Sequence, residues 1–425
     1  MANSFSKQEV VAFDQVLEGF EDALVISKAF RKYQLDGTTA ERAFNTIWRP
    51  QPYIAQSFTG LDQTSNFARN YTQLSVPTTL SYSHAVPLTM TALELRDALQ
   101  EQRLGQAALQ RLASDINVDC MNLASLTGSI VVKRTTAASG FDDLSAVDTV
   151  FNNQGIPMTM RKAFLSSADY NSMASNLAGR QTLNGRTEDA YTNARVGQVA
   201  GFDTYKMDYA YRLTAATATG VTITNTNPLF YTPAATVASA DGLTRNNVDN
   251  RFQNISIAVT SGTVKVGDAF VINGVNAVHH ITKGDTGAQK TFRITGIVSG
   301  AGGTGVVTIT PPIISGTGGT DPELQYKNVV AAPTNGAAIT FLNTVSAPVN
   351  VFWQDDCFEI MPGRYVPATD SGMAVMSATT QSGITVTMAR QGAIGDLSTK
   401  YRWDVFYGLV NLQPEMSGIE LFNQT

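Results

Sequence analysis

Apolar residues near the N-terminus recur at the spacing of one helix face. Over residues 6–33 these positions are Val10, Phe13, Leu17, Phe20, Leu24 and Ile26. That spacing is close to the 3.6-residue period of an amphipathic helix. The run begins at Ser6-Lys7-Gln8-Glu9, which has the spacing of a capping box. The pattern predicts a helix over residues 6–33 that forms an N-terminal arm.

A second apolar stripe is much longer. It follows Thr91-Ala92-Leu93-Glu94, which again has capping-box spacing. Its apolar positions are Leu95, Leu99, Leu109, Leu112, Ile116, Cys120 and Leu123. At a rise of about 1.5 Å per residue, a helix of some thirty residues would be roughly 45 Å long. Because this is longer than a globular core usually needs, we expect a spine around which other parts are arranged.

Between these two stripes the periodicity disappears. Residues 51–80 are rich in Gln, Thr, Ser and Asn and contain no lysine. A segment of this length without a periodic pattern is too long for an ordinary connection between elements. It predicts a long extended loop with a functional role.

The second half of the chain favours β structure. Residues 128–220 mix short strands with a helix that opens at Ser166. From residue 221 to 346, β-branched runs alternate with glycine-rich turns, which is typical of a small barrel or sandwich. Within it we expect a turn at Val266-Gly267-Asp268 and a hairpin at Ile272–Val275. Longer strands after residue 347 should return to the sheet of the first part.

Composition and charge narrow the functional class. The chain has 425 residues, of which 43% are hydrophobic and 15% are charged, below the roughly 25% charged residues of a typical soluble protein. Such a surface is suited to being covered by neighbours. The net charge of −5 argues against a general nucleic-acid binder. Neither a signal peptide nor an apolar run of membrane-spanning length is visible, so we expect synthesis in the cytoplasm and no membrane partner.

Candidate metal and disulfide chemistry is sparse. His279 and His280 are adjacent, and neighbouring residues on a strand point to opposite faces, so the pair is not expected to share one ion. We place one in the barrel interior and the other in water. The third histidine, His84, lies in another segment, and the only cysteines, Cys120 and Cys357, are far apart and fit a reduced compartment.

Two further motifs suggest enzymatic sites but lack the context for them. Gly300–Gly305 matches the GxGxxG dinucleotide fingerprint, yet a strand pattern follows where a helix is required, so a glycine hairpin turn is the better interpretation. Asp355-Asp356-Cys357 looks like a carboxylate pair beside a nucleophile, but strand neighbours diverge and no histidine is close in sequence. We expect no catalytic residue, no metal and no cofactor.

Six short motifs occur in order along the chain. They are Asn45-Thr46-Ile47-Trp48, Glu94-Leu95-Arg96-Asp97, Gln198–Asp203, Asn247–Phe252, Asn350-Val351-Phe352-Trp353, and Gln391–Ile394 followed by Phe406-Tyr407-Gly408. This arrangement, with the β-rich module between the motifs, resembles the major coat proteins of P22-like tailed bacteriophages.

The resemblance implies an α+β fold of the HK97 type with an inserted all-β barrel, the I-domain. The implied divisions are an N-terminal arm (1–45), an E-loop region (46–85), a peripheral domain with the spine helix (86–135), the first part of an axial domain (136–222), the I-domain (223–346), and return strands of the axial and peripheral domains (347–425).

The resemblance also implies a function. It is that of the main structural subunit, which assembles with a scaffolding protein in the host cytoplasm into an icosahedral procapsid and then a capsid around double-stranded DNA. The family suggests pentamers, hexamers, a triangulation number of seven and a portal protein as a further partner, with only loose contact to the DNA. Coats that crosslink themselves by isopeptide bonds need an E-loop lysine, so the lysine-free loop implies non-covalent assembly.

The resemblance also implies which residues of this sequence make contacts between proteins, according to their positions. A loop reaching the next capsomer corresponds to residues 236–251, with Asp241, Arg245, Asp249 and Arg251 as its charges. The contact with scaffolding protein corresponds to Asp14 and Glu18. For the E-loop the expected contacts with a neighbour are Phe58, Asp62, Phe67, Arg69 and Tyr71. The alternative for each charged set is a solvated surface without a partner.

Two other functional classes stay open on sequence alone. A non-enzymatic, adhesin-like surface protein would need an export signal and tandem repeats. An enzyme would need converging polar side chains in a pocket.

Overall fold

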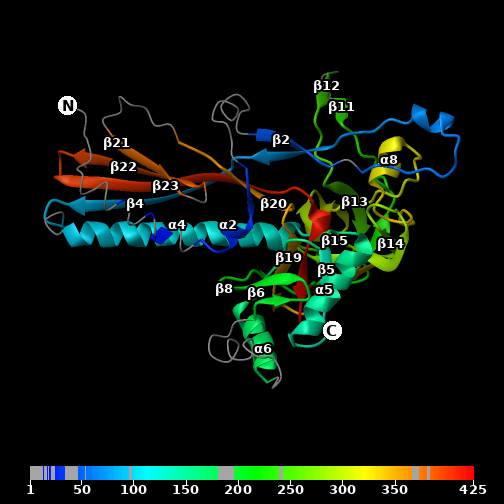
Figure 1. Ribbon diagram of the computed structural model, residues 1–425, viewed down its shortest axis with the longest axis horizontal. Coiled ribbons are helices and arrows are strands. Elements are labelled where there is room, and N and C mark those ends of the chain that lie inside the picture. Colours follow the sequence, from blue (N-terminus) through cyan, green and yellow to red (C-terminus); the bar gives the residue numbers. More distant parts are fainter. Residues whose placement is uncertain are drawn as a thin grey trace. The chain divides into compact units, whose positions relative to one another are not determined.

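The structure of the protein is a computed structural model (Figure 1). It describes residues 13, 17, 19–20, 24–33, 46–52, 54–94, 98–179, 196–238, 243–365, 373–380 and 383–425. The chain divides into two compact units. Unit 1 comprises residues 1–47, 78–123 and 358–410, and unit 2 comprises residues 48–77, 124–357 and 411–425. Each unit is therefore built from segments that are far apart in sequence.

Unit 1 combines a mixed sheet with most of the long helix α4, Ala98–Thr127. Its sheet has the order β1-β20-β23-β22-β21, with β4 also paired to β23. The bounds are α2 Ile26–Ala29, β1 Arg31–Lys32, β4 Tyr82–Thr91, β20 Phe358–Pro362, β21 Ala374–Thr379, β22 Thr385–Ala393 and β23 Ser398–Asn411. Residues 46–50 and 75–79 form a further small sheet, β2-β3.

The apolar stripe of the long helix is its buried face. Leu109, Leu112, Ile116 and Cys120 are all buried, as the spacing predicts. Asp119 of α4 accepts a hydrogen bond of 2.7 Å from the Tyr407 hydroxyl of β23, so the helix is fixed to the sheet by a polar contact as well as by apolar packing. The predicted spine helix is confirmed, although it begins at Ala98 in the structure, and residues 95–97 lie outside the described residues.

The end of the predicted N-terminal helix is wrong. Phe13, Leu17 and Phe20 are helical, but Leu24 and Val25 are not, so the predicted single helix is interrupted there. The short α2 that follows ends at Ala29, and Phe30 has extended backbone angles (φ −78°, ψ 143°). Arg31 and Lys32 instead pair in parallel with Glu359 and Ile360 of β20. The sheet therefore supplies backbone partners that local periodicity does not reveal. The capping box at residues 6–9 lies outside the described residues.

Unit 2 holds a mixed sheet with the order β5-β24-β19-β6-β8-β7, packed against two helices. Phe151 of α5 contacts Phe202 and Phe352 of the sheet, with ring centroids 5.7 and 5.3 Å away. Helix α6 begins at the predicted place, where the Ser166 side chain accepts a hydrogen bond from the Asp169 amide. The bounds are β5 Ile130–Lys133, α5 Phe141–Gln154, β6 Arg161–Ser166, α6 Ser167–Ala178, β7 Gln198–Val199, β8 Phe202–Met207, β19 Asn350–Gln354, η4 Pro414–Met416 and β24 Ser417–Leu421.

The same unit contains the predicted β-barrel. Its six strands have the order β10-β13-β16-β15-β14-β17. The ring closes because Thr222 of β10 bridges to Ala338, next to β17, and the Ile339 amide donates to the Val221 carbonyl at 2.9 Å. The bounds are β10 Thr222–Thr224, β13 Gln253–Ala258, β14 Ala269–Val278, β15 Asp285–Ile297, η3 Gly300–Gly302, β16 Gly305–Thr310, α8 Asp321–Tyr326 and β17 Ile339–Phe341.

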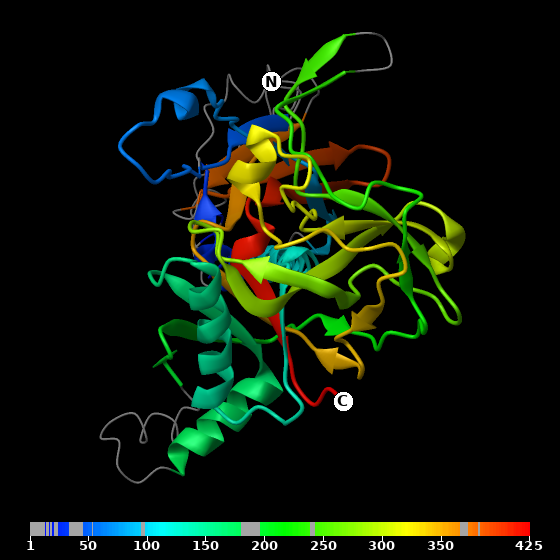
Figure 2. The same cartoon turned by 90° about the vertical axis from the view of Figure 1, so that its right-hand side faces the viewer.

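The barrel interior is filled by side chains. Figure 2 shows the strands of unit 2 from a second side. Phe270 lies at the centre of an aromatic group, 5.7 Å from Phe292 and 6.3 Å from Phe341 between ring centroids. The outer strands are β9 Arg212–Leu213, which pairs with β18 Ala347–Pro348, and the hairpin of β11 Thr236–Ala238 with β12 Thr244–Asn246.

The predicted hairpin at Ile272–Val275 is wrong. Residues 269–278 form one strand, β14, and Gly274 (φ +81°) marks a shift in its register with β15 between Val271 and Asn276. On its other side β14 pairs with β17, and the Asn273 amide donates to the Ala338 carbonyl at 3.0 Å. Partners on both sides thus convert an Asn-Gly turn signal into a bulge. The predicted turn at Val266-Gly267-Asp268 is confirmed.

Candidate assembly surfaces

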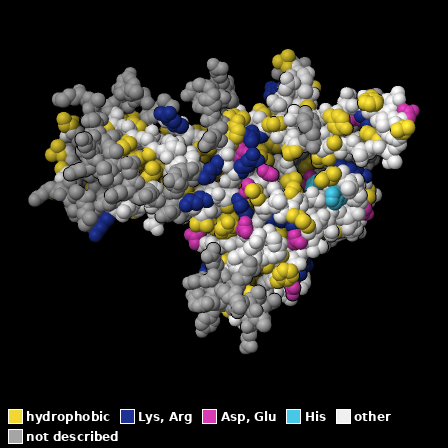
Figure 3. Space-filling view, in the orientation of Figure 1, with side chains coloured by type: hydrophobic (Ala, Val, Ile, Leu, Met, Phe, Trp, Pro, Cys, Tyr) yellow, Lys and Arg dark blue, Asp and Glu magenta, His cyan; other side chains and the backbone are white. Residues whose placement is uncertain are grey.

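The loop of residues 51–80, called the E-loop below, carries exposed apolar side chains. It is not extended throughout, because it contains the 3-10 helix η1 (Thr64–Ala68). Near its end it forms the strand β3 (Ser75–Thr79). Leu61 is fully exposed and Phe67 is 88% exposed. Hydrophobic side chains are visible on this loop in Figure 3. These exposed apolar side chains make the E-loop a candidate contact surface.

Polar side chains order the tip of the E-loop. Asp62 accepts hydrogen bonds from the amide (3.0 Å) and hydroxyl (2.6 Å) of Thr64, at the start of η1. These two bonds lower the pKa of Asp62. The Arg69 guanidinium lies 5.0 Å from the centroid of the Phe58 ring. Of the predicted contact residues, Asp62, Arg69 and Phe58 thus make contacts within the loop, while Phe67 and Tyr71 are mainly exposed.

The β11–β12 hairpin is the second protruding feature. Arg245 is paired with Val237 across the hairpin, and every described residue of both strands is exposed. Leu243, next to the tip, is 66% exposed. Asp241 lies outside the described residues, as do Asp14 and Glu18. The hairpin therefore presents both apolar and charged groups to solvent.

Asp249 and Arg251 lie at the base of this hairpin and bind each other. Arg251 donates to both carboxylate oxygens of Asp249, at 2.8 and 2.6 Å. Its remaining terminal nitrogen donates to the Asn411 carbonyl at 2.7 Å. With side-chain exposures of 24% for Asp249 and 11% for Arg251, the pair belongs to the support of the hairpin more than to its surface. Their expected contact with a neighbouring capsomer stays a prediction.

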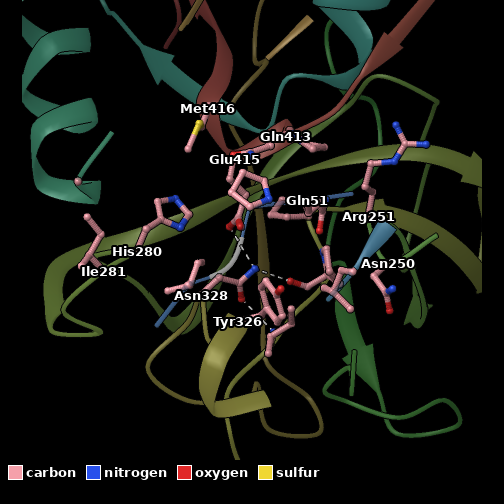
Figure 4. Close-up of a pocket in the computed structure, with 18 of the residues that line it drawn as sticks. Gln51, Asn250, Arg251, His280, Ile281, Tyr326, Asn328, Gln413, Glu415 and Met416 are labelled. Carbon is pink, nitrogen blue, oxygen red and sulfur yellow. Dashed lines mark hydrogen bonds between the residues drawn. The ribbon is translucent and has the colours of Figure 1, made fainter. Parts of the chain in front are cut away.

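A pocket of about 240 Å³ lies within unit 2, close to the base of the E-loop (Figure 4). Much of its wall is conformationally restricted proline, contributed by Pro52, Pro157, Pro311, Pro312 and Pro414. Gln51 and Leu74 from the two ends of the loop also line it. The pocket is therefore bounded jointly by the loop and the barrel.

Glu415, which lines the pocket, forms an ion pair with a buried lysine. Lys290 of β15 is 1% exposed and donates to Glu415 of η4 at 2.5 Å, and the Asn328 side chain donates to the same oxygen at 3.1 Å. Burial raises the pKa of Glu415, but the positive charge of Lys290 and neighbouring cations outweigh it and lower that pKa to about 2. The carboxylate stays ionised and holds the barrel to the C-terminal segment.

His280 lines the same pocket, but the strand assignment for the histidine pair is wrong. Strand β14 ends at Val278, and His279 and His280 lie in the following turn. The backbone amide of His280 donates to the Gln154 carbonyl at 2.9 Å, next to Gly155, where an added Cβ would lie 2.4 Å from the His279 ring. Burial lowers the pKa of His280 to about 4, so its side chain is neutral at pH 7.

The other motifs considered as catalytic or ligand-binding sites lie in turns or make contacts within the fold. Gly300–Gly305 forms the connection of the β15–β16 hairpin, as expected. Residues 355–357 lie in a turn after β19, not in a strand, and the Cys357 thiol donates to the Gln413 carbonyl at 2.9 Å. Burial raises the pKa of this thiol to about 12. His84 pairs with Asp119 of α4 at 2.6 Å.

The described parts of the chain contain no group of three His, Cys, Asp or Glu side chains arranged to hold a metal ion. Among helices in these same ranges, none has the length and apolarity needed to cross a membrane.

Comparison with known proteins decides the family. A family model described as "P22 coat protein - gene protein 5" matches residues 1–423. The chain belongs to the P22 coat protein family. It is accordingly a structural capsid subunit of a bacteriophage, located in the virion capsid, with the HK97-like α+β fold and an inserted barrel. Its self-association into a shell follows from the same membership.

Several solved structures are similar to this coat protein at low sequence identity or over part of its length. The capsid of cyanophage P-SCSP1u has a TM-score of 0.46 at 9% identity, over 94% of this chain and 88% of that chain. A structure of Mycobacterium phage Che8 has a TM-score of 0.43 at 9% identity, over 93% and 90%. The CUS-3 coat protein I-domain is 34% identical over 30% of this chain and 99% of that chain, with a TM-score of 0.21. The family assignment rests on the sequence match over residues 1–423.

Sequence reasoning did not find the helix α8 or the buried charges of this coat protein. A signal for α8 exists, because Asp321-Pro322 follows Thr320 and proline in the first turn is a helix-start signal. The partners of Lys290 and Arg293 have no comparable local signal, since they are brought close only by the tertiary fold.

Proposed function

We propose that this coat protein assembles with a scaffolding protein into an icosahedral procapsid, which becomes the mature capsid around double-stranded DNA. The observation that supports this most directly is the family match along nearly the whole chain, residues 1–423. Assembly takes place in the host cytoplasm, with a portal protein at one vertex and loose contact with the packaged DNA. The shell consists of pentamers and hexamers, with a triangulation number of seven.

Each division of the chain has a role in this proposal. The N-terminal arm, residues 1–45, meets the scaffolding protein through Asp14 and Glu18. The E-loop region, residues 46–85, covers a neighbour with its apolar tip, and the I-domain, residues 223–346, reaches the next capsomer through the β11–β12 hairpin and Arg245. Residues 86–135, 136–222 and 347–425 form the peripheral and axial domains. Many weak contacts of this kind add up to a stable closed shell while single contacts remain reversible.

The exposed side chains of the E-loop support its role as a contact between subunits. Leu61 and Phe67 both present their apolar side chains almost entirely to solvent. Burial of such side chains stabilises an interface by about 1.5–3 kcal/mol for each. Since no lysine occurs between residues 51 and 80, these contacts are non-covalent.

Electron microscopy of the chain expressed with and without a scaffolding protein from the same phage tests the proposal. Uniform closed shells with scaffolding protein and aberrant ones without it are the expected result. If the chain remained monomeric under both conditions, the proposal would be wrong.

A further inference from the structure

Helix α8 of the barrel binds both the backbone amide and the backbone carbonyl of one E-loop residue, Thr72. The Gln325 side chain accepts a hydrogen bond from the Thr72 amide at 3.1 Å and donates to the Thr72 carbonyl at 3.2 Å. The Tyr326 hydroxyl donates to the same carbonyl at 2.9 Å. Two side chains of one helix thus occupy the backbone groups that a neighbouring strand would otherwise bind.

A second contact lies one turn earlier on α8. The Asp321 carboxylate accepts a hydrogen bond from the Asn70 amide at 3.0 Å. Its other oxygen lies 3.7 Å from the Arg69 guanidinium, and both side chains are about one-third exposed. An ion pair in such a position contributes little. The backbone contacts at Asn70 and Thr72 therefore position the loop.

The helix that makes these contacts is itself firmly held. Glu323, on the same helix, is 0% exposed and accepts hydrogen bonds from the Gly318 amide at 2.7 Å and from the Thr232 hydroxyl. Just after the helix, the Asn328 side chain accepts from the Ile314 amide at 2.9 Å and donates to the Pro312 carbonyl at 2.8 Å. A loop residue bound to α8 is thus bound to a fixed support.

Because Gln325 is buried, its contact with Thr72 is unfavourable to break. Gln325 is 1% exposed, so releasing Thr72 would leave a buried amide without its partners, which is unfavourable. Surface side chains of the loop do not have this constraint. Figures 1 and 2 show α8 beside the loop, with the loop tip extending beyond it. The base of the E-loop is therefore fixed while its tip stays accessible.

We propose that α8 is the positioning element of the E-loop, with Gln325 as its central residue, and that it sets the direction in which the apolar tip meets a second copy of the chain. This inference rests on the proposed function of the E-loop as a contact between subunits. It goes further in stating that the E-loop is already held at Thr72 within each subunit before assembly.

Hydrogen exchange of the full-length soluble chain tests the positioning role. In Gln325→Leu we expect the Thr72 amide to exchange at least tenfold faster, while barrel amides such as those of Ile257 and Ile309 keep their protection. Asp321→Asn is the matched control, because it retains an oxygen for the Asn70 amide and should leave Thr72 protected. Unchanged exchange at Thr72 in Gln325→Leu would overturn the proposal.

A milder variant covers the case in which Gln325→Leu disturbs the barrel. Tyr326→Phe removes only the hydroxyl that donates to the Thr72 carbonyl, and we expect it to accelerate Thr72 exchange about threefold while the barrel amides are unaffected. Equal exchange in Tyr326→Phe and the wild type would then count against the proposal.

Assembly with scaffolding protein separates this inference from the proposed function. We expect Gln325→Leu to give at least threefold fewer closed shells, and Asp321→Asn to resemble the wild type. Normal shells from a variant whose Thr72 is released would overturn the positioning role and leave the coat function intact. Failure of the wild-type chain to form shells would instead contradict the proposed function, while the exchange result would still decide whether α8 fixes the loop.

Discussion

Arg293 of β15 donates a hydrogen bond of 2.8 Å to the carbonyl oxygen of Ser125, in the last turn of α4. The guanidinium is 0% exposed and also donates to the carbonyls of Gly128 and Gly267. Burial lowers its pKa to about 10, so it remains charged at pH 7. A cation at a helix C-terminus interacts favourably with the carbonyl groups there. The barrel thus stabilises the end of the long helix.

We expect Arg293→Met to destabilise the chain by about 2–4 kcal/mol, because the helix carbonyls lose a charged donor inside the protein. Urea unfolding followed by circular dichroism measures this. Gln289→Ala, at an exposed position of the same strand, is the control and should stay within about 0.5 kcal/mol of the wild type. Similar stability of the two variants would mean that the Arg293 contacts contribute nothing.

Glu420 of β24 makes the stability of the chain sensitive to alkaline pH. It is 1% exposed, and neither carboxylate oxygen has a hydrogen-bond partner among the residues that the structure describes. Burial together with the negative charge of Asp143 raises its pKa to about 8. The folded chain therefore keeps this proton up to about pH 8, whereas the unfolded chain releases it near pH 4.5. Its contribution to stability is complete below pH 4.5 and is lost as the pH rises to about 8.

Replacing Glu420 by Gln should remove this part of the pH dependence. We expect Glu420→Gln to raise the free energy of unfolding by about 1–3 kcal/mol at pH 8 and to have much less effect at pH 4.5. Equilibrium unfolding at the two pH values measures the difference. An equal effect at both would show that Glu420 does not carry a proton in the folded chain.

His280 should make the chain sensitive to acid. Its folded pKa of about 4 lies below the ordinary value of 6.5, so only the unfolded chain takes up this proton as the pH falls from 6.5 to 4. Stability is lost over that window. The groups that act on the ring are Glu415, Lys290, Lys283 and His279. The contribution of Glu415 to stability is lost only at lower pH, as the pH falls towards its pKa of about 2.

We expect His280→Phe to flatten the dependence of unfolding free energy on pH between 6.5 and 4, since phenylalanine cannot take up a proton. Urea unfolding at pH 7, 5.5 and 4 gives the comparison. Gln289→Ala, at an exposed position without a titratable side chain, is the control and should leave the slope unchanged. An unchanged slope in His280→Phe would contradict the assignment.

The apolar tip of the E-loop should matter for assembly and not for the stability of the single chain. Leu61→Ser and Phe67→Ser replace exposed side chains, so their unfolding free energies should stay within about 0.5 kcal/mol of the wild type. We expect both to lower the yield of closed shells, measured by sedimentation and electron microscopy, relative to the exposed control Thr59→Ser. Wild-type yields from both would exclude the tip as a contact.

Mature shells should dissociate fully in hot detergent. Because residues 51–80 contain no lysine, we expect a single band at the 45.6 kDa of one chain in denaturing electrophoresis. Ladders of dimers and larger species that resist reduction would show covalent links between subunits.

The sequence predicts features that depend on local pattern and misses those that depend on distant partners. The stripe through Leu112 and Ile116 is enough to identify α4, and Ser166 with Asp169 is enough to place the start of α6. The Asn273-Gly274 pair, by contrast, forms a turn only if the strand ends there, and pairing of β14 on both sides keeps the strand continuous.

The candidate surfaces also combine features that the local sequence predicts with features that depend on distant partners. The E-loop was predicted from its composition, and its exposed Phe67 lies where the family resemblance puts a contact. Gln325 gives no signal, because it becomes important only when the fold brings it to Thr72, which belongs to a distant part of the sequence. Asp249 and Arg251 look like surface charges in the sequence but bind each other in the structure.

The closed barrel has a consequence for crowding in a growing shell. Open sheet edges carry unpaired amide and carbonyl groups that recruit strands from other molecules and lead to aggregation. Here the first and last strands of the barrel bind each other, so many copies can be held at very high local concentration without fusing through this module. In the proposed assembly, encounters between neighbours are then left to the protruding loops, whose side chains can discriminate a correct partner from a wrong one.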